Sequence, residues 1–166
     1  DLDLVAGHIV NGAFWNMGEN CSASSRLIVH ADIKDDLLKR IGVQMREWKM
    51  GNPLDPENRL GAMVSKSHFE KVRSYLEQAS VEKLDVVFGG NTEGNIFVEP
   101  TVVDGVGVDS RLFKEEIFGP VLTVTTFKTI DEAITLANDS VYGLAASVYT
   151  DNLRHAIKLS REIRAG

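Results

Sequence analysis

The chain has 166 residues, of which 43% are hydrophobic and 25% charged, as in an ordinary soluble globular protein. A chain of this length can bury a core of its own, and no long linker divides it, so residues 1–166 are expected to form a single domain. The formal net charge of −6 argues against binding to nucleic acid, because a phosphate backbone requires a basic face. The sequence lacks the roughly 18-residue apolar run that a membrane-spanning helix needs, and it lacks a zinc-type Cys/His spacing. Neither a membrane nor a metal is therefore expected as a partner.

Cys21 is the only cysteine, so the chain can form no internal disulfide, and a reducing, cytoplasmic location is expected. Residues 1–20 lack the basic segment of a secretory signal peptide. The chain begins without Met inside one helical pattern and stops directly after another. We expect both ends to be cuts through a longer protein.

The first third of the chain predicts helix, strand and helix. Residues 1–14 carry apolar side chains at helical spacing behind acidic residues, and "NMGEN" then breaks the pattern. "RLIVH" (26–30) predicts a short strand. Asp32 is expected to cap a second helix, whose apolar positions recur at helical spacing as far as Trp48.

The middle of the chain predicts a loop, a helix and two extended segments. "MGNPLDPENRLG" (50–61) is rich in Pro, Gly and Asn and predicts an ordered loop or crossing segment. Ser65 is expected to start a third helix. "LDVVFGG" (84–90) predicts a strand that runs into a glycine turn. "NIFVEPTVVDGV" (95–106) predicts a second extended run, with Pro100 at an edge or a bulge.

The last third predicts two further strands and two helices. "GPVLTVTTF" (119–127) alternates and is rich in β-branched residues, which favours a strand. A helix over 130–138, a strand over 144–149 and a helix over 151–163 are expected to follow. Strands that alternate with helices predict an α/β fold with a mostly parallel, Rossmann-like sheet covered by helices on both faces. Sheets of this class place ligands at the carboxyl ends of their strands.

Cys21 lies in "FWNMGENCSASSRLIV" (14–29), a segment built like a turn rather than like a core strand. A thiolate is the reactive form of cysteine, and backbone amides of a glycine-containing turn can stabilise it and the oxyanion that forms when it attacks a carbonyl. Free cysteines are more often buried and inert. If Cys21 reacts, two chemistries remain open from the residues alone. A Cys-His hydrolase would use one of the four histidines as base, and a dehydrogenase would pass a hydride from a covalent adduct to a nicotinamide.

The cysteine segment resembles the active-site segment of the aldehyde dehydrogenase superfamily, with its Asn five and its Gly three positions before the Cys. Further segments are similar to the family's in the right order: "GNPLDPENRLGAMVS", "GGNTEGNIFVEPTVV", "KEEIFGPVLTV" and "NDSVYGLAASVYT". The resemblance extends over nearly the whole chain. It implies the catalytic-domain portion of an enzyme that oxidises an aldehyde to a carboxylic acid through a cysteine thiohemiacetal and a thioester, with NAD or NADP as cofactor.

The resemblance also implies roles for individual residues. Cys21 would be the nucleophile, with its backbone N–H as half of the oxyanion hole, and Asn16 would support the cysteine loop. Glu116 would accept hydrogen bonds from the ribose hydroxyls next to the nicotinamide, and Phe118 would pack beside them. Trp15 would line the aldehyde channel. Without the resemblance, Glu116 would be interpreted as part of a solvated acid pair, and Trp15 and Phe118 as packing residues.

Members of this family are much longer than 166 residues, so the resemblance implies that the cofactor-binding and oligomerisation parts are absent here. The parent is expected to be a homo-oligomer, a dimer or a tetramer. The isolated chain is expected to be inactive, because the water-activating base and the dinucleotide cradle would lie upstream. The alternative is a non-enzymatic truncated or assembly domain.

Glu19 departs from the family pattern, which often has Gln two positions before the Cys. An acid at this position would disfavour the thiolate by like-charge repulsion unless its carboxylate points away or pairs.

Overall fold

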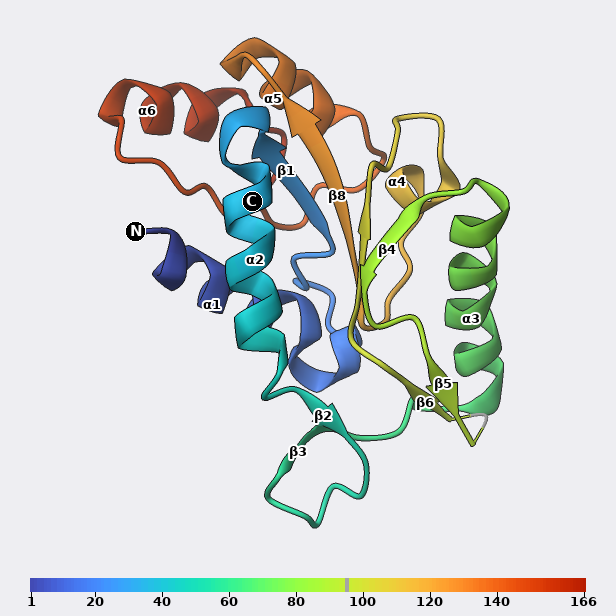
Figure 1. Ribbon diagram of the computed structural model, residues 1–166. Coiled ribbons are helices and arrows are strands. Elements are labelled where there is room, and N and C mark those ends of the chain that lie inside the picture. The colour runs from blue at the N-terminus through green and yellow to red at the C-terminus, as the bar shows by residue number, and fades with distance from the viewer. Residues whose placement is uncertain (95) are drawn as a thin grey trace.

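A four-stranded sheet lies at the centre of the structure, a computed structural model that describes residues 1–94 and 96–166 (Figure 1). Its strands, in spatial order, are β1 (Arg26–His30), β8 (Val121–Phe127), β7 (Thr101–Asp104) and β4 (Asp85–Phe88). β8 pairs in parallel with both β1 and β7, and only the β4–β7 pair is antiparallel. The prediction of a mostly parallel α/β sheet is therefore confirmed.

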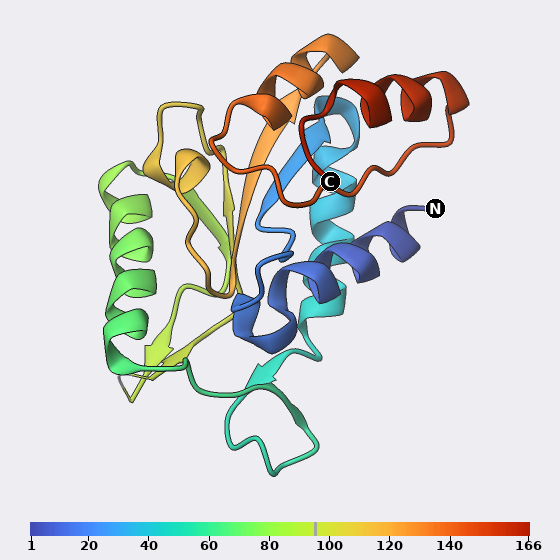
Figure 2. The ribbon, with the colours of Figure 1, turned by 180° about the vertical axis from the view of Figure 1, so that it is seen from behind.

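Helices cover both faces of the sheet, as predicted (Figures 1 and 2). The helices are α1 (Leu2–Phe14), α2 (Lys34–Met45), α3 (Lys66–Val81), α4 (Arg111–Lys114), α5 (Ile130–Asn138) and α6 (Leu153–Glu162). α1 and α2 pack together on one face, and α3 and α4 lie on the opposite face. Of the helices in the described residues, none is long and apolar enough to cross a membrane.

The two faces of the sheet form two hydrophobic cores, and β8 contributes to both. Successive side chains of a strand point to opposite faces. Leu122 and Val124 accordingly lie in the core under α1 and α2, whereas Val121 lies in the core under α3 and α4. The short, fully apolar start of β8 is thus held from both sides, as expected for a central parallel strand.

Two of the predicted helix starts are confirmed and one is wrong. The Asp1 carboxylate accepts hydrogen bonds from the N–H groups of Asp3 and Leu4, and the Ser65 hydroxyl accepts one from His68 N–H. Asp32 does not cap α2. It lies in a 3₁₀ turn (Ala31–Ile33), where its own N–H donates to Nδ1 of His30, and α2 begins only at Lys34.

The predicted loop and extended segments carry short strands. The loop over 50–61 is bounded by a small parallel pair, β2 (Lys49–Met50) and β3 (Asn58–Leu60). The run over 95–106 divides into β6 (Phe97–Val98), which pairs with β5 (Thr92–Glu93), and β7, with Pro100 between them. Asn95, the first residue of that predicted run, lies outside the described residues.

The predicted strand over 144–149 is wrong. This segment is extended but exposed, and it pairs with no strand in the described part of the chain. Its apolar side chains face solvent, with Leu144 59% and Tyr149 46% exposed. Alternation of apolar and polar residues predicts a strand only where a neighbouring strand supplies the hydrogen bonds, and here no such neighbour is present among the described residues.

The substitution Leu122→Ala tests the contribution of the central strand. Leu122 is 1% exposed, so its truncation is expected to lower the free energy of unfolding by about 2–5 kcal/mol, the usual cost of a buried leucine cavity. Leu54→Ala makes the same chemical change at a side chain that is 90% exposed and is expected to cost less than about 0.5 kcal/mol. Urea unfolding of both variants measures the difference; equal losses would contradict the placement of β8 between two cores.

Candidate active site

The cysteine loop is shaped by three consecutive residues with left-handed backbone. α1 ends at Phe14 and runs into a short 3₁₀ turn (Trp15–Gly18), in which φ is 54° at Asn16, 58° at Met17 and 66° at Gly18. The Asn16 side-chain amide donates a 3.0 Å hydrogen bond to the Glu19 carbonyl and so closes the turn. Left-handed backbone is unfavourable for residues other than glycine, so this turn stores strain.

Cys21 is exposed at the tip of this loop, and its thiol is therefore accessible. Its Sγ lies 3.9 Å from Oδ1 of Asn20, and the same oxygen accepts hydrogen bonds from the N–H and hydroxyl of Ser22. Within the described residues, no acceptor is bonded to the Cys21 N–H, which is thus free to bind an oxyanion.

The Cys-His hydrolase alternative finds no base in this arrangement. In the described part of the chain, no imidazole is hydrogen bonded to Sγ of Cys21. His30 contacts Asp32 at the far end of β1, and His68 contacts other residues described below. His8 lies beside Tyr149, and His155 is in α6.

Residues 115–120, within the predicted segment "KEEIFGPVLTV", lead from α4 into β8. Glu116 is exposed, and its backbone is held at both ends: Lys71 Nζ donates to its carbonyl at 3.0 Å, and its N–H donates to the Tyr142 hydroxyl at 3.4 Å. Among the described residues, none donates to the Glu116 carboxylate, which leaves both oxygens available to a ligand. Phe118 is half-buried and has a left-handed backbone, with φ 59°.

The two segments touch through their glycines. A Cβ on Gly18 would lie only 2.2 Å from the Gly119 carbonyl oxygen, and a Cβ on Gly119 would lie 2.6 Å from a methyl group of Val72 in α3. No side chain other than hydrogen fits at either position without moving backbone or α3. The structure therefore brings the Cys21 loop and the Glu116–Phe118 segment together, although they are almost 100 residues apart.

Both segments lie at the amino ends of their strands, not at the carboxyl ends where ligands were expected. The cysteine loop precedes β1, and the Glu116–Phe118 segment precedes β8, and these two strands are parallel neighbours. The Ser25 carbonyl accepts hydrogen bonds from the N–H and hydroxyl of Thr123, which fixes the exit of the cysteine loop against β8. The left-handed residues that shape the two segments also precede these strands, so the thiol and the carboxylate are presented at this end of the sheet.

Glu19 points away from Cys21. Its side chain is 8% exposed, and its Oε1 accepts a 3.0 Å hydrogen bond from the Val64 N–H and lies 3.5 Å from Nε2 of His68. The departure from the family pattern is thus paired with groups at the start of α3. Sequence reasoning missed His68 and Val64 because they lie over 40 residues from Glu19; the only signal was that an acid so near the cysteine requires a partner.

Glu115, next to Glu116, is tied to two side chains. Nε and Nη2 of Arg111 donate to its two carboxylate oxygens at 2.9 Å each, and the Tyr75 hydroxyl donates to one of them at 2.8 Å. The hydrogen bonds from Arg111 and Tyr75 lower the pKa of the Glu115 carboxyl to about 2. Burial, and then the hydrogen bond to Glu115, raises the pKa of the Tyr75 phenol to about 12. Glu115 thus anchors the segment, whereas Glu116 presents its carboxylate.

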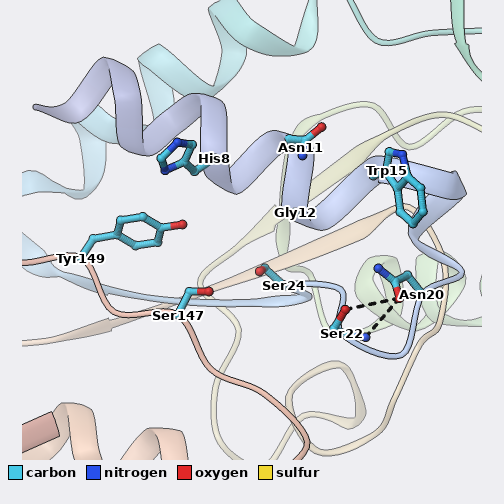
Figure 3. Close-up of a pocket in the computed structure, with 9 residues that line it drawn as sticks. All are labelled: His8, Asn11, Gly12, Trp15, Asn20, Ser22, Ser24, Ser147 and Tyr149. Atoms are coloured by element: carbon cyan, nitrogen blue, oxygen red, sulfur yellow. Dashed lines mark hydrogen bonds between the residues drawn. The ribbon is translucent and has the colours of Figure 1, made fainter. Parts of the chain in front are cut away.

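A cavity of about 340 Å³ lies beside the cysteine loop (Figure 3). Asn20 and Ser22, the neighbours of Cys21 on either side, line it together with residues of α1 and of the extended segment after α5. Trp15, which was expected in the aldehyde channel, is 59% exposed and lines this cavity. Ser147 and Tyr149 face it from the other side (Figure 3).

Comparison with known proteins identifies the family of the chain. The sequence profile of the aldehyde dehydrogenase family matches residues 1–166. The chain belongs to this family. The resemblance and the Rossmann-like α/β fold predicted from the sequence are thereby confirmed.

Relatives of this aldehyde dehydrogenase chain are similar along its whole length. Aminoacetaldehyde dehydrogenase of Pseudomonas aeruginosa is 75% identical over 166 residues, which are 100% of this chain and 34% of that protein. The crystal structure of an indole-3-acetaldehyde dehydrogenase in complex with NAD⁺ is 44% identical, with a TM-score of 0.96, and that of an NAD-dependent aldehyde dehydrogenase from Sinorhizobium meliloti is 42% identical, with a TM-score of 0.95. The match covers 100% of this chain and 34% of each of those chains, so the chain spans about a third of the length of the relatives it matches.

The glycine contact of this aldehyde dehydrogenase chain can be tested with two matched variants. Gly18→Ala introduces a methyl group against the Gly119 carbonyl in left-handed backbone, whereas Gly105→Ala introduces one at φ 73° with nothing within 4 Å. Both variants carry the backbone penalty, so Gly18→Ala is expected to lose about 1–3 kcal/mol more stability, the cost of overpacking. Chemical unfolding measures both losses, and equal losses would show that the two loops do not touch.

The anchoring of Glu115 predicts a dependence on pH. Its carboxyl pKa lies below the ordinary 4.5, so its ionised form stabilises the folded state above pH 4.5, and this contribution disappears as the pH falls to about 2. Glu115→Gln is therefore expected to be less stable than the unmodified chain at neutral pH, with a difference that shrinks between pH 4.5 and 2. Tyr75→Phe removes the hydrogen bond from Tyr75 to the Glu115 carboxylate but leaves the two from Arg111. In this variant the Glu115 pKa should be lowered less, so the stabilisation should disappear over a narrower pH range. Urea unfolding over a pH series measures the effect; a difference that stays constant down to pH 2 would contradict it.

Proposed function

We propose that the full-length protein containing this chain oxidises an aldehyde to a carboxylic acid, with Cys21 as the nucleophile and NAD as the hydride acceptor. The proposal rests above all on one observation. The contact between Gly18 and Gly119 joins a loop with an exposed thiol to a segment with a free, exposed carboxylate. A packing role would not require two strained turns to present these groups on one edge of the sheet.

The residues of the second segment fit a nicotinamide cofactor. A carboxylate only accepts hydrogen bonds, so the free oxygens of Glu116 suit the two hydroxyls of a ribose. The half-buried ring of Phe118 offers an apolar surface next to it. The bound nicotinamide accepts a hydride. We assign NAD rather than NADP because the similar solved structures include an NAD-dependent enzyme and an NAD⁺ complex.

Cys21 would divide the oxidation into two easier steps. Its thiolate adds to the aldehyde carbon, and the C=O electron pair moves to the oxygen, whose negative charge the free Cys21 N–H stabilises. Loss of hydride from this carbon restores the carbonyl and leaves a thioester on Sγ. Water then adds to the thioester, and the carboxylic acid departs as the thiol is regenerated.

A small aldehyde with an amino group is the proposed substrate. The relative that is 75% identical is described as an aminoacetaldehyde dehydrogenase. The cavity beside the cysteine loop is lined by amide and hydroxyl groups of Asn11, Asn20 and Ser147 together with the indole of Trp15. Carbonyl and hydroxyl oxygens, and the face of an indole, are favourable surroundings for an ammonium group.

A non-enzymatic assembly domain is the second candidate, and the exposed apolar segment after α5 favours it. Val141, Leu144, Val148 and Tyr149 are 40–92% exposed, which is typical of a surface that packs against further protein. The two candidates differ in the state of Cys21, because an assembly role needs no reactive thiol. Rapid alkylation by iodoacetamide supports the enzyme, and an inert thiol supports the assembly domain.

Replacement of Cys21 tests the proposed function. In the full-length protein, Cys21→Ala is expected to lower NADH formation from aminoacetaldehyde and NAD by at least about 10³-fold, because the covalent route is lost. Its cofactor affinity should stay unchanged, since in the described part of the chain Sγ of Cys21 is hydrogen bonded to Asn20 and to no residue of the Glu116 segment. Absorbance of NADH at saturating aldehyde measures the rate. Undiminished NADH formation by the variant would refute the role of Cys21.

A further inference from the structure

His68 lies where the cysteine loop and the Glu116–Phe118 segment meet. Its Nε2 is 2.6 Å from the Phe118 carbonyl oxygen and 3.5 Å from Oε1 of Glu19. Both partners can only accept a hydrogen bond, so Nε2 carries the hydrogen and donates it. The imidazole is 16% exposed and belongs to α3, outside both segments. One side chain on a third element thus contacts the two parts of the site.

One partner of His68 has left-handed backbone, and the other directly follows left-handed residues. Phe118 has a φ of 59°, and Glu19 directly follows the three left-handed residues that end at Gly18. The ring of His68 also contacts the Phe118 ring edge-on, with centroids 5.9 Å apart. Strained conformations persist only where surrounding contacts determine them. The contacts of His68 with the Phe118 carbonyl, the Phe118 ring and the Glu19 carboxylate are contacts of this kind.

The start of α3 is itself held in place by hydrogen bonds and packing. The Ser65 hydroxyl caps the helix by accepting a hydrogen bond from the His68 N–H at 3.2 Å. The Val64 N–H donates to the Glu19 carboxylate at 3.0 Å, and Val72 of the same helix packs against Gly119. Neither His68 nor the start of α3 contacts the Cys21 thiol or the Glu116 carboxylate directly.

We propose that His68 is a positioning residue that couples the cysteine loop to the cofactor-binding segment, by holding the Glu19 carboxylate and the Phe118 carbonyl at once. This inference rests on the proposed function. Without the imidazole, the Glu19 carboxylate keeps only the Val64 N–H as a partner and is less firmly held away from the thiol two residues away. A carboxylate there disfavours the thiolate, and the released Phe118 carbonyl lets the Glu116 segment move.

The test measures two properties that do not require turnover, in the full-length protein. The first is the rate of iodoacetamide alkylation at the Cys21 peptide without cofactor, followed by mass spectrometry. The second is the dissociation constant of NAD, measured by calorimetry. His68→Leu is expected to slow alkylation about three- to ten-fold and to weaken NAD binding by a similar factor, the size expected for one lost hydrogen bond.

Two further variants separate positioning from a general loss of stability. His68→Gln keeps a side-chain N–H of similar reach and is expected to stay within about two-fold of the unmodified protein in both readouts. His30→Leu is the matched control, because His30 also contacts a carboxylate, a backbone N–H and a phenylalanine ring, those of Asp32 and Phe127, but at the far end of β1. It is expected to leave both readouts unchanged.

Each outcome decides for or against the coupling. A His68→Leu protein with unchanged alkylation and NAD binding, or equal losses in His68→Leu and His68→Gln, overturns it. If His68→Leu does not fold, His68→Asn replaces it, because its shorter amide does not reach the Phe118 carbonyl, and the same criteria apply. Failure of the proposed function is distinguishable: the unmodified protein would then form no NADH from any aldehyde, while the alkylation rates would still show whether His68 positions the cysteine loop.

Discussion

The close approach of Gly18 to the Gly119 carbonyl is the constraint on which the arrangement of the site depends. Gly18 can approach the Gly119 carbonyl this closely only because it carries no Cβ, and the left-handed φ of Gly18 adds a second requirement for glycine. Residues on either side follow from this contact. Cys21 is placed three residues beyond Gly18, and Glu116 and Phe118 lie just before Gly119. The separation between Cys21 and the Glu116 carboxylate is therefore set by backbone rather than by flexible side chains, which is how precise geometry is best maintained.

The sheet supplies the frame in which this contact can occur. β1 and β8 are parallel neighbours, so the segments that precede them reach the same edge of the sheet. The core under α1 and α2 and the core under α3 and α4 hold β8 from both faces. α3 then acts on the loops themselves, through His68 at the Phe118 carbonyl, Lys71 at the Glu116 carbonyl and Tyr75 at the Glu115 carboxylate. Three side chains of one helix face, at positions i, i+3 and i+7, thus follow the segment from Phe118 back to Glu115.

Features encoded by neighbouring residues could be predicted from the sequence, and features made by distant segments could not. The helix over 1–14 and the strands over 26–30 and 119–127 follow from local periodicity, and Cys21 and Glu116 were found through motifs of adjacent residues. The contacts of Glu19 with Val64 and His68 join segments over 40 residues apart, and no pattern of neighbouring residues predicts them. The strand over 144–149 was wrong for the converse reason, since its pattern is local but its hydrogen-bond partner must come from elsewhere. The candidate site lies before its strands, whereas the general rule for open sheets concerns the loops after strands, so that rule did not point to these turns.

Strain is the strongest physical argument against an inert remnant. Asn16, Met17 and Phe118 are non-glycine residues with positive φ, and each such residue costs of the order of 1 kcal/mol or more. A domain that only folds or assembles gains nothing from this cost, because an ordinary turn could join α1 to β1 with fewer restrictions. Of the four non-glycine residues with positive φ in the described part of the chain, three lie in the two segments that meet at Gly18 and Gly119, beside an exposed thiol and a free carboxylate, and the fourth, Lys83, follows α3. Glu19 fits the same pattern, since a buried acid requires a partner, and the structure directs its carboxylate away from Cys21 to the start of α3.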